Sequence, residues 1–210
     1  MSTEAVILDI DQTIYKNRYL AHAYDEAMVN LIAKKYDMDF AEARESLENK
    51  KKYIYMIEGL SSTTKALLAS GITIDEWIDF SCSQVDPRDY LAGDKGVIRT
   101  VKWLCKNFKI AVISNNNSIQ LFRTYEAIGV EGYLSDVTTL SISNTKILKP
   151  NISLFGMALS RINVVAPNAL SVGDREEIDL APARLLGMLT YKIDKMEDFY
   201  TLDSNIKASV

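Results

Sequence analysis

The sequence has very few of the side chains on which several common kinds of active site depend. It contains a single histidine, His22, and two cysteines, Cys82 and Cys105, among 210 residues. One histidine excludes a His-rich metal site, and a Ser-His-Asp triad would have to use His22. The cysteines have neither metal-binding nor redox spacing, so we interpret them as reduced thiols of a cytoplasmic protein.

Several motifs of binding and targeting are also missing. The sequence has no Walker A loop, no Gly-x-Gly-x-x-Gly and no Gly-x-Ser-x-Gly, which leaves triphosphate or dinucleotide binding by those loops unsupported. No apolar run approaches the ~20 residues of a membrane span. The first expected strand begins within a few residues of the N-terminus, with no basic-then-apolar leader. We therefore expect a soluble cytoplasmic protein without a membrane partner.

The sequence has no excess of positive charge. Its formal net charge is -4, its pI is about 5.2, and 48% of its residues are hydrophobic. Binding to a nucleic acid polymer depends on basic side chains, so no such partner is expected. The length suits one large domain or a core with an insertion. The sequence does not predict the oligomeric state.

Short apolar runs do alternate with helical periods in most of the chain. The runs predict buried strands at 6–8, 109–113, 133–137, 169–172 and 188–193, with helices between the later ones. Strands and helices that alternate over short connections form parallel βαβ units. The sequence therefore predicts an α/β fold with a doubly wound parallel sheet. The segment after Phe199 is expected to be peripheral or loosely held.

One long segment departs from this alternation and reads as all-helical. Apolar residues at three- and four-residue steps predict a helix up to Tyr36, and Asp39 with Glu42 forms a capping-box pattern for the next one. Gly59 ends that helix, and two shorter helices are expected at 63–69 and 73–80. We expect a core made of 1–15 and 93–210, interrupted by a helical domain at 16–92.

Polar residues that could bind a ligand or take part in a reaction follow four of the expected strands or the loops after them. In a doubly wound sheet these strand ends converge on one crevice, where ligands bind. The candidate site residues are Asp9, Asp11, Thr13, Ser114, Asn115, Lys149, Asp174 and Asp179.

This set of side chains suits the chemistry of a phosphoryl group. An aspartate can attack phosphorus and form an aspartyl phosphate, while a second one moves protons. Clustered carboxylates resist joint ionisation, so the site favours an oxygen-ligated cation, most plausibly Mg²⁺. Lysine, hydroxyl and amide groups bind phosphate oxygens. Lys149 is preferred over Lys146 because Pro150 fixes it at an extended boundary before a helix.

Four segments together resemble the motifs of the haloacid dehalogenase superfamily. They occur in the expected order, each at the end of its element: residues 9–13 (DIDQT), 114–115 (SN), 149–150 (KP) and 173–179 (GDREEID). The resemblance implies a Rossmann-like core, with Asp9 as nucleophile and Asp11 as general acid/base. It also implies Mg²⁺ held by Asp9, by the backbone carbonyl of Asp11 and by Asp174, with Asp179 in support. Thr13, Ser114, Asn115 and Lys149 would then position the phosphoryl group.

The helical segment is similar to the caps of pyrimidine 5′-nucleotidase-like and phosphoglycolate-phosphatase-like members, and in such proteins the cap usually sets the substrate. Asp11 favours phosphatase or phosphomutase chemistry, since dehalogenase-like members lack an acid/base there and transport ATPases carry threonine. Gln12 departs from the pattern, which more often has a small residue or asparagine.

We therefore expect a Mg²⁺-dependent phosphatase that acts on a small phosphorylated metabolite, such as a nucleoside monophosphate or a phosphoglycolate-like compound. A phosphomutase remains open, because it would share the same site. A phospho-accepting signalling or binding module is the alternative from another class. The helical insertion argues against that module, because a receiver-sized fold of ~120 residues has no such lid.

Overall fold

The computed structural model describes the backbone of residues 3–208 and the side chains of residues 3–206. The chain divides into two compact units, which are described separately. Unit 1 consists of Met1–Lys16 and Leu91–Val210, and unit 2 consists of Asn17–Tyr90. Within the described residues, no helix has both the length and the apolar character needed to cross a membrane.

Unit 1 is built on a five-stranded sheet in the order β3-β2-β1-β4-β5, with every neighbouring pair parallel. The order reverses beside β1, as in doubly wound folds, so the predicted α/β class is confirmed. The strands are β1 (Ala5–Leu8), β2 (Lys109–Ile113), β3 (Thr138–Leu140), β4 (Ala169–Gly173) and β5 (Leu189–Lys192).

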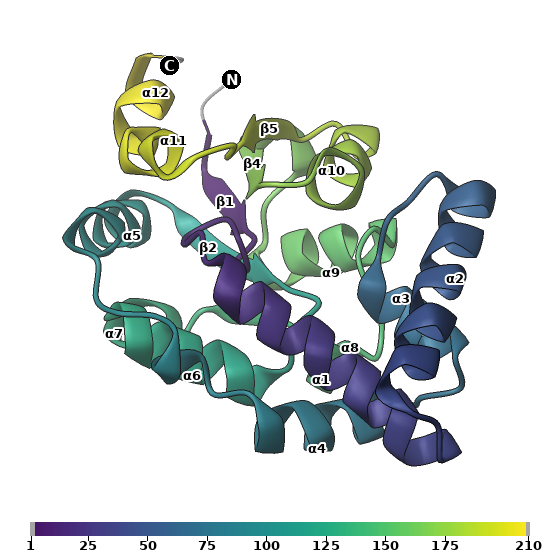
Figure 1. Ribbon diagram of the computed structural model, residues 1–210. Coiled ribbons are helices and arrows are strands. Elements are labelled where there is room, and N and C mark those ends of the chain that lie inside the picture. The colour runs from purple at the N-terminus through teal and green to yellow at the C-terminus, as the bar shows by residue number, and fades with distance from the viewer. Residues whose placement is uncertain (1–2, 209–210) are drawn as a thin grey trace. The chain divides into compact units, whose positions relative to one another are not determined.

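The centre of the sheet is buried on both faces. All four residues of β1 are buried, which explains why the strand reads as a continuous apolar run rather than an alternating one. Ile7 packs in one hydrophobic cluster with Phe155 of α9 (Ile152–Ile162) and Ala183 of α10 (Ala181–Leu185). Figure 1 shows α9 and α10 on one side of the sheet, and α5 (Lys95–Asn107), α11 (Met196–Tyr200) and α12 (Leu202–Ala208) on the other.

One strand of unit 1 is not where the sequence predicts it. The strand expected at 133–137 is instead the short helix α7 (Glu131–Leu134), and β3 begins only at Thr138. Backbone bonds from Leu134 to Val130 and from Ser135 to Glu131 close helical turns there, so local hydrogen bonding outweighs the strand propensity of the aromatic and apolar residues.

The region after β4 also differs from expectation. In place of one continuous helix between the last two strands, a π-helical segment (Glu176–Leu180) precedes α10. Of the two alternatives expected for the segment after Phe199, the described residues favour a packed peripheral element. Phe199 and Leu202 are fully buried, and α11 and α12 contact α5. The remaining short elements of unit 1 are α6 (Ser118–Ile128), α8 (Ile142–Thr145) and the 3₁₀ turn Ala166–Asn168.

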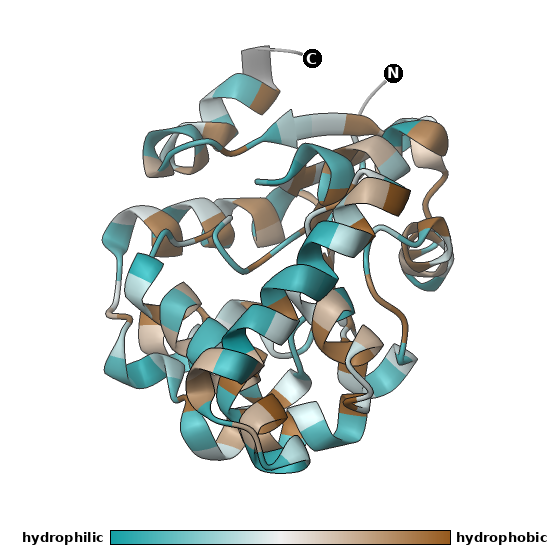
Figure 2. Ribbon diagram, turned by 45° about the vertical axis from the view of Figure 1, so that its right-hand side comes forward, coloured by the Kyte–Doolittle hydropathy of each residue, from teal (hydrophilic) through white to brown (hydrophobic). Residues whose placement is uncertain are grey.

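Unit 2 is helical throughout. It consists of α1 (Arg18–Tyr36), α2 (Phe40–Glu58), α3 (Thr63–Ala69), α4 (Ile74–Gln84) and the 3₁₀ turn Pro87–Asp89. The predicted capping box is present, because the Asp39 side chain accepts from the Glu42 N–H and the Glu42 side chain accepts from the Asp39 N–H. Gly59 ends α2 at φ 67, in the left-handed region that favours glycine. Figure 2 shows teal and brown residues alternating along the helices, as expected of amphipathic helices with one buried stripe.

Candidate active site

The turn that follows β1 pairs each of its two aspartates with a hydroxyl four residues later. Thr13 Oγ1 donates to Asp9 Oδ2 at 2.6 Å, and the Tyr15 hydroxyl donates to Asp11 Oδ1 at 2.7 Å. The chain can fold back this tightly because Gln12 has a φ of 61°, in the left-handed region. Thr13, a predicted site residue, therefore orients the Asp9 carboxylate in this structure. Its hydroxyl is fully buried, and its role in binding phosphate stays a prediction.

The residues after β2 approach Asp11 from the neighbouring strand. Ser114 Oγ lies 3.2 Å from Asp11 Oδ2, and Asn116 Nδ2 lies 3.4 Å from Asp11 Oδ1. The Asn116 N–H donates to Ser114 Oγ at 3.0 Å, which fixes the hydroxyl at the strand end. Ser114 thus lies where the sequence predicts it, and its hydroxyl contacts the second aspartate.

Lys149 is the cation at the centre of the site. Its ammonium lies 2.5 Å from Asp9 Oδ1 and 2.6 Å from Asp179 Oδ1, and only 4% of the residue is exposed. Asn115 holds the backbone of Lys149: its Oδ1 accepts from the Lys149 N–H at 2.7 Å, and its Nδ2 donates to the Lys149 carbonyl at 3.3 Å. The peptide bond from Lys149 to Pro150 is cis. Lys146, the competing lysine of the sequence, is exposed at the end of α8.

The segment after β4 contributes two further carboxylates. Asp179 Oδ2 accepts from the Arg175 N–H at 3.0 Å, and Ser171 Oγ donates to the Asp179 carbonyl at 3.1 Å. Gly173 makes room for this arrangement, because a Cβ at its position would lie 2.4 Å from the Cβ of Asp179. The π-helical segment thereby directs a buried carboxylate back toward the end of β1.

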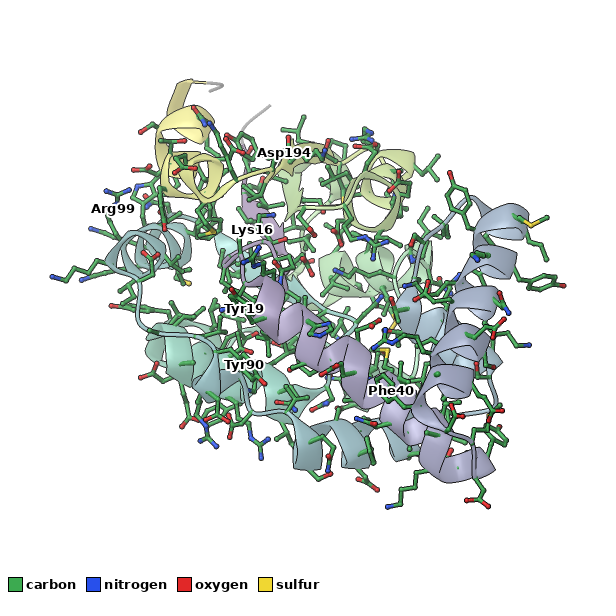
Figure 3. All side chains as sticks on the ribbon, viewed as in Figure 1. Lys16, Tyr19, Phe40, Tyr90, Arg99 and Asp194 are labelled. Atoms are coloured by element: carbon green, nitrogen blue, oxygen red, sulfur yellow. The ribbon has the colours of Figure 1, made fainter. Side chains whose placement is uncertain are left out.

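Asp174 has a different environment. Among the described residues, no hydrogen bond to its carboxylate is found, and the nearest cation is Lys16, whose Nζ lies 4.0 Å from Oδ2. Lys16 is held by a hydrogen bond of 3.0 Å to the carbonyl of Ile193. Figure 3 shows Lys16 in the loop after β1, below Asp194 at the end of β5. Asp174 therefore presents a half-buried carboxylate with unused acceptor capacity.

Burial and mutual repulsion shift the pKa values of these groups. Burial raises the pKa of Asp9 to about 7, although the Lys149 ammonium opposes this change and the neighbouring carboxylates reinforce it. Burial and the Asp179 charge raise the pKa of Asp174 to about 6. Burial would lower the pKa of Lys149, but Asp179 and Asp9 outweigh it and keep the ammonium charged. The negative charge of these carboxylates thus exceeds the positive charge of the one buried lysine, so the site favours a further positive charge.

The donor set fits a divalent cation such as Mg²⁺. Oxygen atoms of Asp9, Asp174 and Asp179 all lie within 4.8 Å of one another, and carboxylate oxygens are the ligands that such hard cations prefer. Asp174 has unused acceptors, and a divalent cation beside these buried carboxylates would lower their raised pKa values. Asp179 has both oxygens engaged, by Lys149 and by Arg175, so it suits a supporting place better than a direct one.

The structure thus brings all eight predicted side chains to one edge of the sheet. Sequence reasoning did not assign Tyr15, Lys16, Asn116 or Ser171, each of which contacts a predicted site residue. The four-residue spacing shared by Asp9–Thr13 and Asp11–Tyr15 is the one pattern in the sequence that could have indicated Tyr15.

A parallel doubly wound sheet with aspartates after β1 and β4 and a buried lysine between them defines an α/β fold with a buried acidic centre that could hold a cation. The chain belongs to the haloacid dehalogenase-like hydrolases, because the model of that family matches residues 3–187. The resemblance drawn from the four motifs is therefore confirmed, and so is the expectation of a hydrolase of this family.

Similar proteins support the same assignment. A curated relative, glyceraldehyde 3-phosphate phosphatase of Methanocaldococcus jannaschii, is 26% identical over 96% of this chain and 93% of its own length. A HAD phosphatase from Thermococcus onnurineus matches with a TM-score of 0.67 and 19% identity, over 97% of this chain and 98% of that one. A 2-haloacid dehalogenase from Pseudomonas syringae pv. Tomato DC3000 matches with a TM-score of 0.61 and 19% identity, over 99% and 100% of the two chains. At these identities, the two structures support the fold alone.

Proposed function

We propose that the protein is a Mg²⁺-dependent phosphatase that hydrolyses a small phosphomonoester through an aspartyl phosphate on Asp9. The observation that carries the proposal is the pairing of Asp9 with the Lys149 ammonium at 2.5 Å, beside a second aspartate on the same turn. Phosphoric monoester hydrolysis needs this combination of a nucleophile, a fixed cation and a proton carrier. The name of the Methanocaldococcus relative, a phosphatase of a small phosphorylated compound, supports the same reaction.

In the proposed mechanism, a carboxylate oxygen of Asp9 attacks phosphorus and the ester oxygen leaves. Thr13 donates to Oδ2 and Lys149 donates to Oδ1, so hydrogen bonds orient both oxygens of the Asp9 carboxylate. Asp11 gives its proton to the leaving oxygen and later takes a proton from the water that hydrolyses the aspartyl phosphate. Ser114, Asn115 and Lys149 are the proposed binding groups for the phosphoryl oxygens, together with Thr13.

Asp9, the backbone carbonyl of Asp11 and Asp174 are the proposed Mg²⁺ ligands, with Asp179 in support. A divalent cation there would offset the repulsion between the carboxylates and the phosphate dianion. Lys16 lies beside Asp174, and Lys149 lies beside Asp9 and Asp179, so each of these carboxylates also has a fixed positive charge near it.

The choice of substrate is proposed only as a class. The phosphate dianion is common to nucleoside monophosphates, phosphoglycolate and triose phosphates, and the core residues described above would contact that common part. We propose that unit 2 serves as the cap that selects the remainder of the substrate, on the strength of the family resemblance.

The test is release of inorganic phosphate from a panel of phosphorylated metabolites, measured with Mg²⁺ and with EDTA. Wild-type protein should release phosphate from one class of compound in Mg²⁺ alone, and Asp9→Asn should lose at least about a thousandfold of that rate while keeping its circular dichroism spectrum. An Asp9→Asn protein that keeps most of its activity would contradict the assignment of the nucleophile. Isomerisation of a sugar phosphate without phosphate release would replace the phosphatase with a mutase, and stable phosphorylation without turnover would replace it with a phospho-accepting module.

A further inference from the structure

The Tyr15 hydroxyl holds the carboxyl group of Asp11 from a buried and rigid position. Only 6% of Tyr15 is exposed, and its hydroxyl lies 2.7 Å from Asp11 Oδ1. The adjoining Ile14 is fully buried, and its N–H donates to the carbonyl of Ile10, so the backbone that carries the tyrosine is fixed on both sides of the turn. A tyrosine ring has two rotatable bonds, which leaves its hydroxyl little freedom once the ring is packed.

The other donors to Asp11 are weaker by geometry. Ser114 Oγ lies 3.2 Å from Asp11 Oδ2, and Asn116 Nδ2 lies 3.4 Å from Asp11 Oδ1. Hydrogen bonds between hydroxyl and carboxylate oxygens are usually 2.5–3.0 Å long, and longer ones constrain orientation less. Tyr15 therefore makes the shortest of these three contacts. Asp11 itself is partly exposed, so its own packing does not fix its rotamer.

The contact also distinguishes the two oxygens of Asp11. Oδ1 lies 2.7 Å from the Tyr15 hydroxyl and 3.4 Å from Asn116 Nδ2, an amide nitrogen that can only donate, so Oδ1 is an acceptor in this arrangement. Oδ2 faces the Ser114 hydroxyl, which can rotate and either donate or accept. When Asp11 is protonated, its proton is therefore best placed on Oδ2, and Oδ1 remains the oxygen that accepts from Tyr15.

We infer that Tyr15 is a positioning residue that orients the Asp11 carboxyl so that Oδ2 delivers the proton to the leaving oxygen. The inference rests on the proposed function, because it assigns Tyr15 a task only if Asp11 acts as the general acid. A tyrosine that merely fills space beneath the turn would serve stability and would not affect one kind of substrate more than another.

The test compares kcat/KM of wild-type protein and Tyr15→Phe on two substrates. One is the best alkyl phosphate of the metabolite panel, whose leaving oxygen needs a proton, and the other is p-nitrophenyl phosphate, whose leaving group departs without one. Tyr15→Phe should lower kcat/KM about tenfold for the alkyl phosphate and less than about twofold for the aryl phosphate, with KM little changed. Assays are run below the unfolding midpoint of the variant.

The chain offers a matched control in Tyr200→Phe. Tyr200 donates to Asp94 Oδ2 at 2.6 Å, so the control removes a second tyrosine–aspartate hydrogen bond from unit 1, one that contacts none of the proposed catalytic residues. It should leave both kcat/KM values unchanged. In an Asp11→Asn background, Tyr15→Phe should add no further loss for the alkyl phosphate, since the hydroxyl then has no acid to orient.

Each remaining outcome counts against a particular statement. Equal losses on both substrates, a loss that persists in the Asp11→Asn background, or a Tyr15→Phe protein that does not fold would overturn the role of Tyr15 and leave the phosphatase intact. Wild-type protein that releases phosphate from neither substrate would overturn the proposed function, and the role of Tyr15 with it.

Discussion

The Lys149 ammonium lies 2.5 Å from Oδ1 of Asp9, and both residues are more than nine-tenths buried. Asp179 shares the same ammonium at 2.6 Å, so one buried positive charge faces two buried negative ones. Such an arrangement is costly to disturb from either side, because the remaining charges would be left without partners in a region that excludes water. Four experiments probe this centre and the framework around it.

Removing the lysine charge should destabilise the fold. In Lys149→Met, two carboxylates lose their common partner, and breaking a buried ion pair in this way costs about 3–5 kcal/mol of unfolding free energy. Urea unfolding at neutral pH in EDTA measures the loss. Lys146→Met, at an exposed lysine three residues earlier, should change the unfolding free energy by less than about 0.5 kcal/mol. Equal stability of the two variants would contradict the pairing.

Magnesium should raise the thermal unfolding midpoint of the wild-type protein. A ligand that binds only the folded state stabilises it by about 2.7 kcal/mol when present at a hundred times its dissociation constant. Asp174→Asn should abolish most of this response, since Asp174 supplies the carboxylate with unused acceptors. Asp194→Asn, whose side chain is 70% exposed, should respond as the wild type does. A response that survives in Asp174→Asn would place the cation elsewhere.

Adding one methyl group beneath the π-helical segment should displace Asp179. The new Cβ of Gly173→Ala would lie 2.4 Å from the Cβ of Asp179, closer than side chains can approach. We expect a loss of about 1–3 kcal/mol in unfolding free energy and a smaller stabilisation by Mg²⁺. Gly156→Ala is the control, because its Cβ would meet no atom within 4 Å and α9 should gain about 0.5–1 kcal/mol. Similar effects at both positions would refute the close approach.

Asp94, at the N-terminus of α5, should make the unfolding free energy depend on pH in the acid range. Burial pushes the pKa of Asp94 upward, but hydrogen bonds from the Tyr200 hydroxyl and from the N–H groups of Val97 and Gly96 outweigh it and hold the pKa below its ordinary value of 3.8. A depressed pKa in the folded state stabilises the protein above the unfolded pKa, and that contribution disappears as the pH falls through the folded value.

Asp94→Asn keeps an acceptor at this position and cannot titrate. Wild-type protein should therefore be more stable than the variant at pH 6 in urea, and the difference should shrink as the pH falls below about 4. A difference that stays constant between pH 6 and pH 3 would show that Asp94 carries no such linkage. Arg99, labelled on α5 in Figure 3, also donates to the Tyr200 carbonyl at 2.7 Å, a contact that does not depend on the charge of Asp94.

The sequence predicts the sheet and the location of the site well because both depend on local patterns. Buried strands of a parallel sheet are continuous apolar runs, and the residue after each run must lie at the same edge as its neighbours. Asp9, Ser114 and Asp174 could therefore be placed together without coordinates. Gly59 and the Asp39–Glu42 pair fixed both ends of α2 by the same local logic.

The features that sequence reasoning missed depend on contacts between distant segments. Lys16 meets Asp174 only because β1 and β4 are neighbours, and Ser171 reaches the Asp179 carbonyl only because the chain tightens into a π-helical segment. The strand wrongly expected at 133–137 shows that a local pattern can also mislead. Its aromatic and apolar residues suit a strand, yet the segment that pairs with β2 begins at Thr138.

The register of β1 also bears on how the chain assembles during synthesis. Ala5 pairs with Lys109 on one side and with Ala169 on the other, so the strand that leads to Asp9 is made before both of its neighbours and gains the second one only after Ala169 has been made. Pairings of such wide sequence separation form slowly, and an apolar strand waiting for them is exposed to misassembly. The helices of unit 2, whose contacts are local, can form during that interval. The strand that leads to Asp9 is thus made before both of its neighbours and is among the last to be paired on both edges.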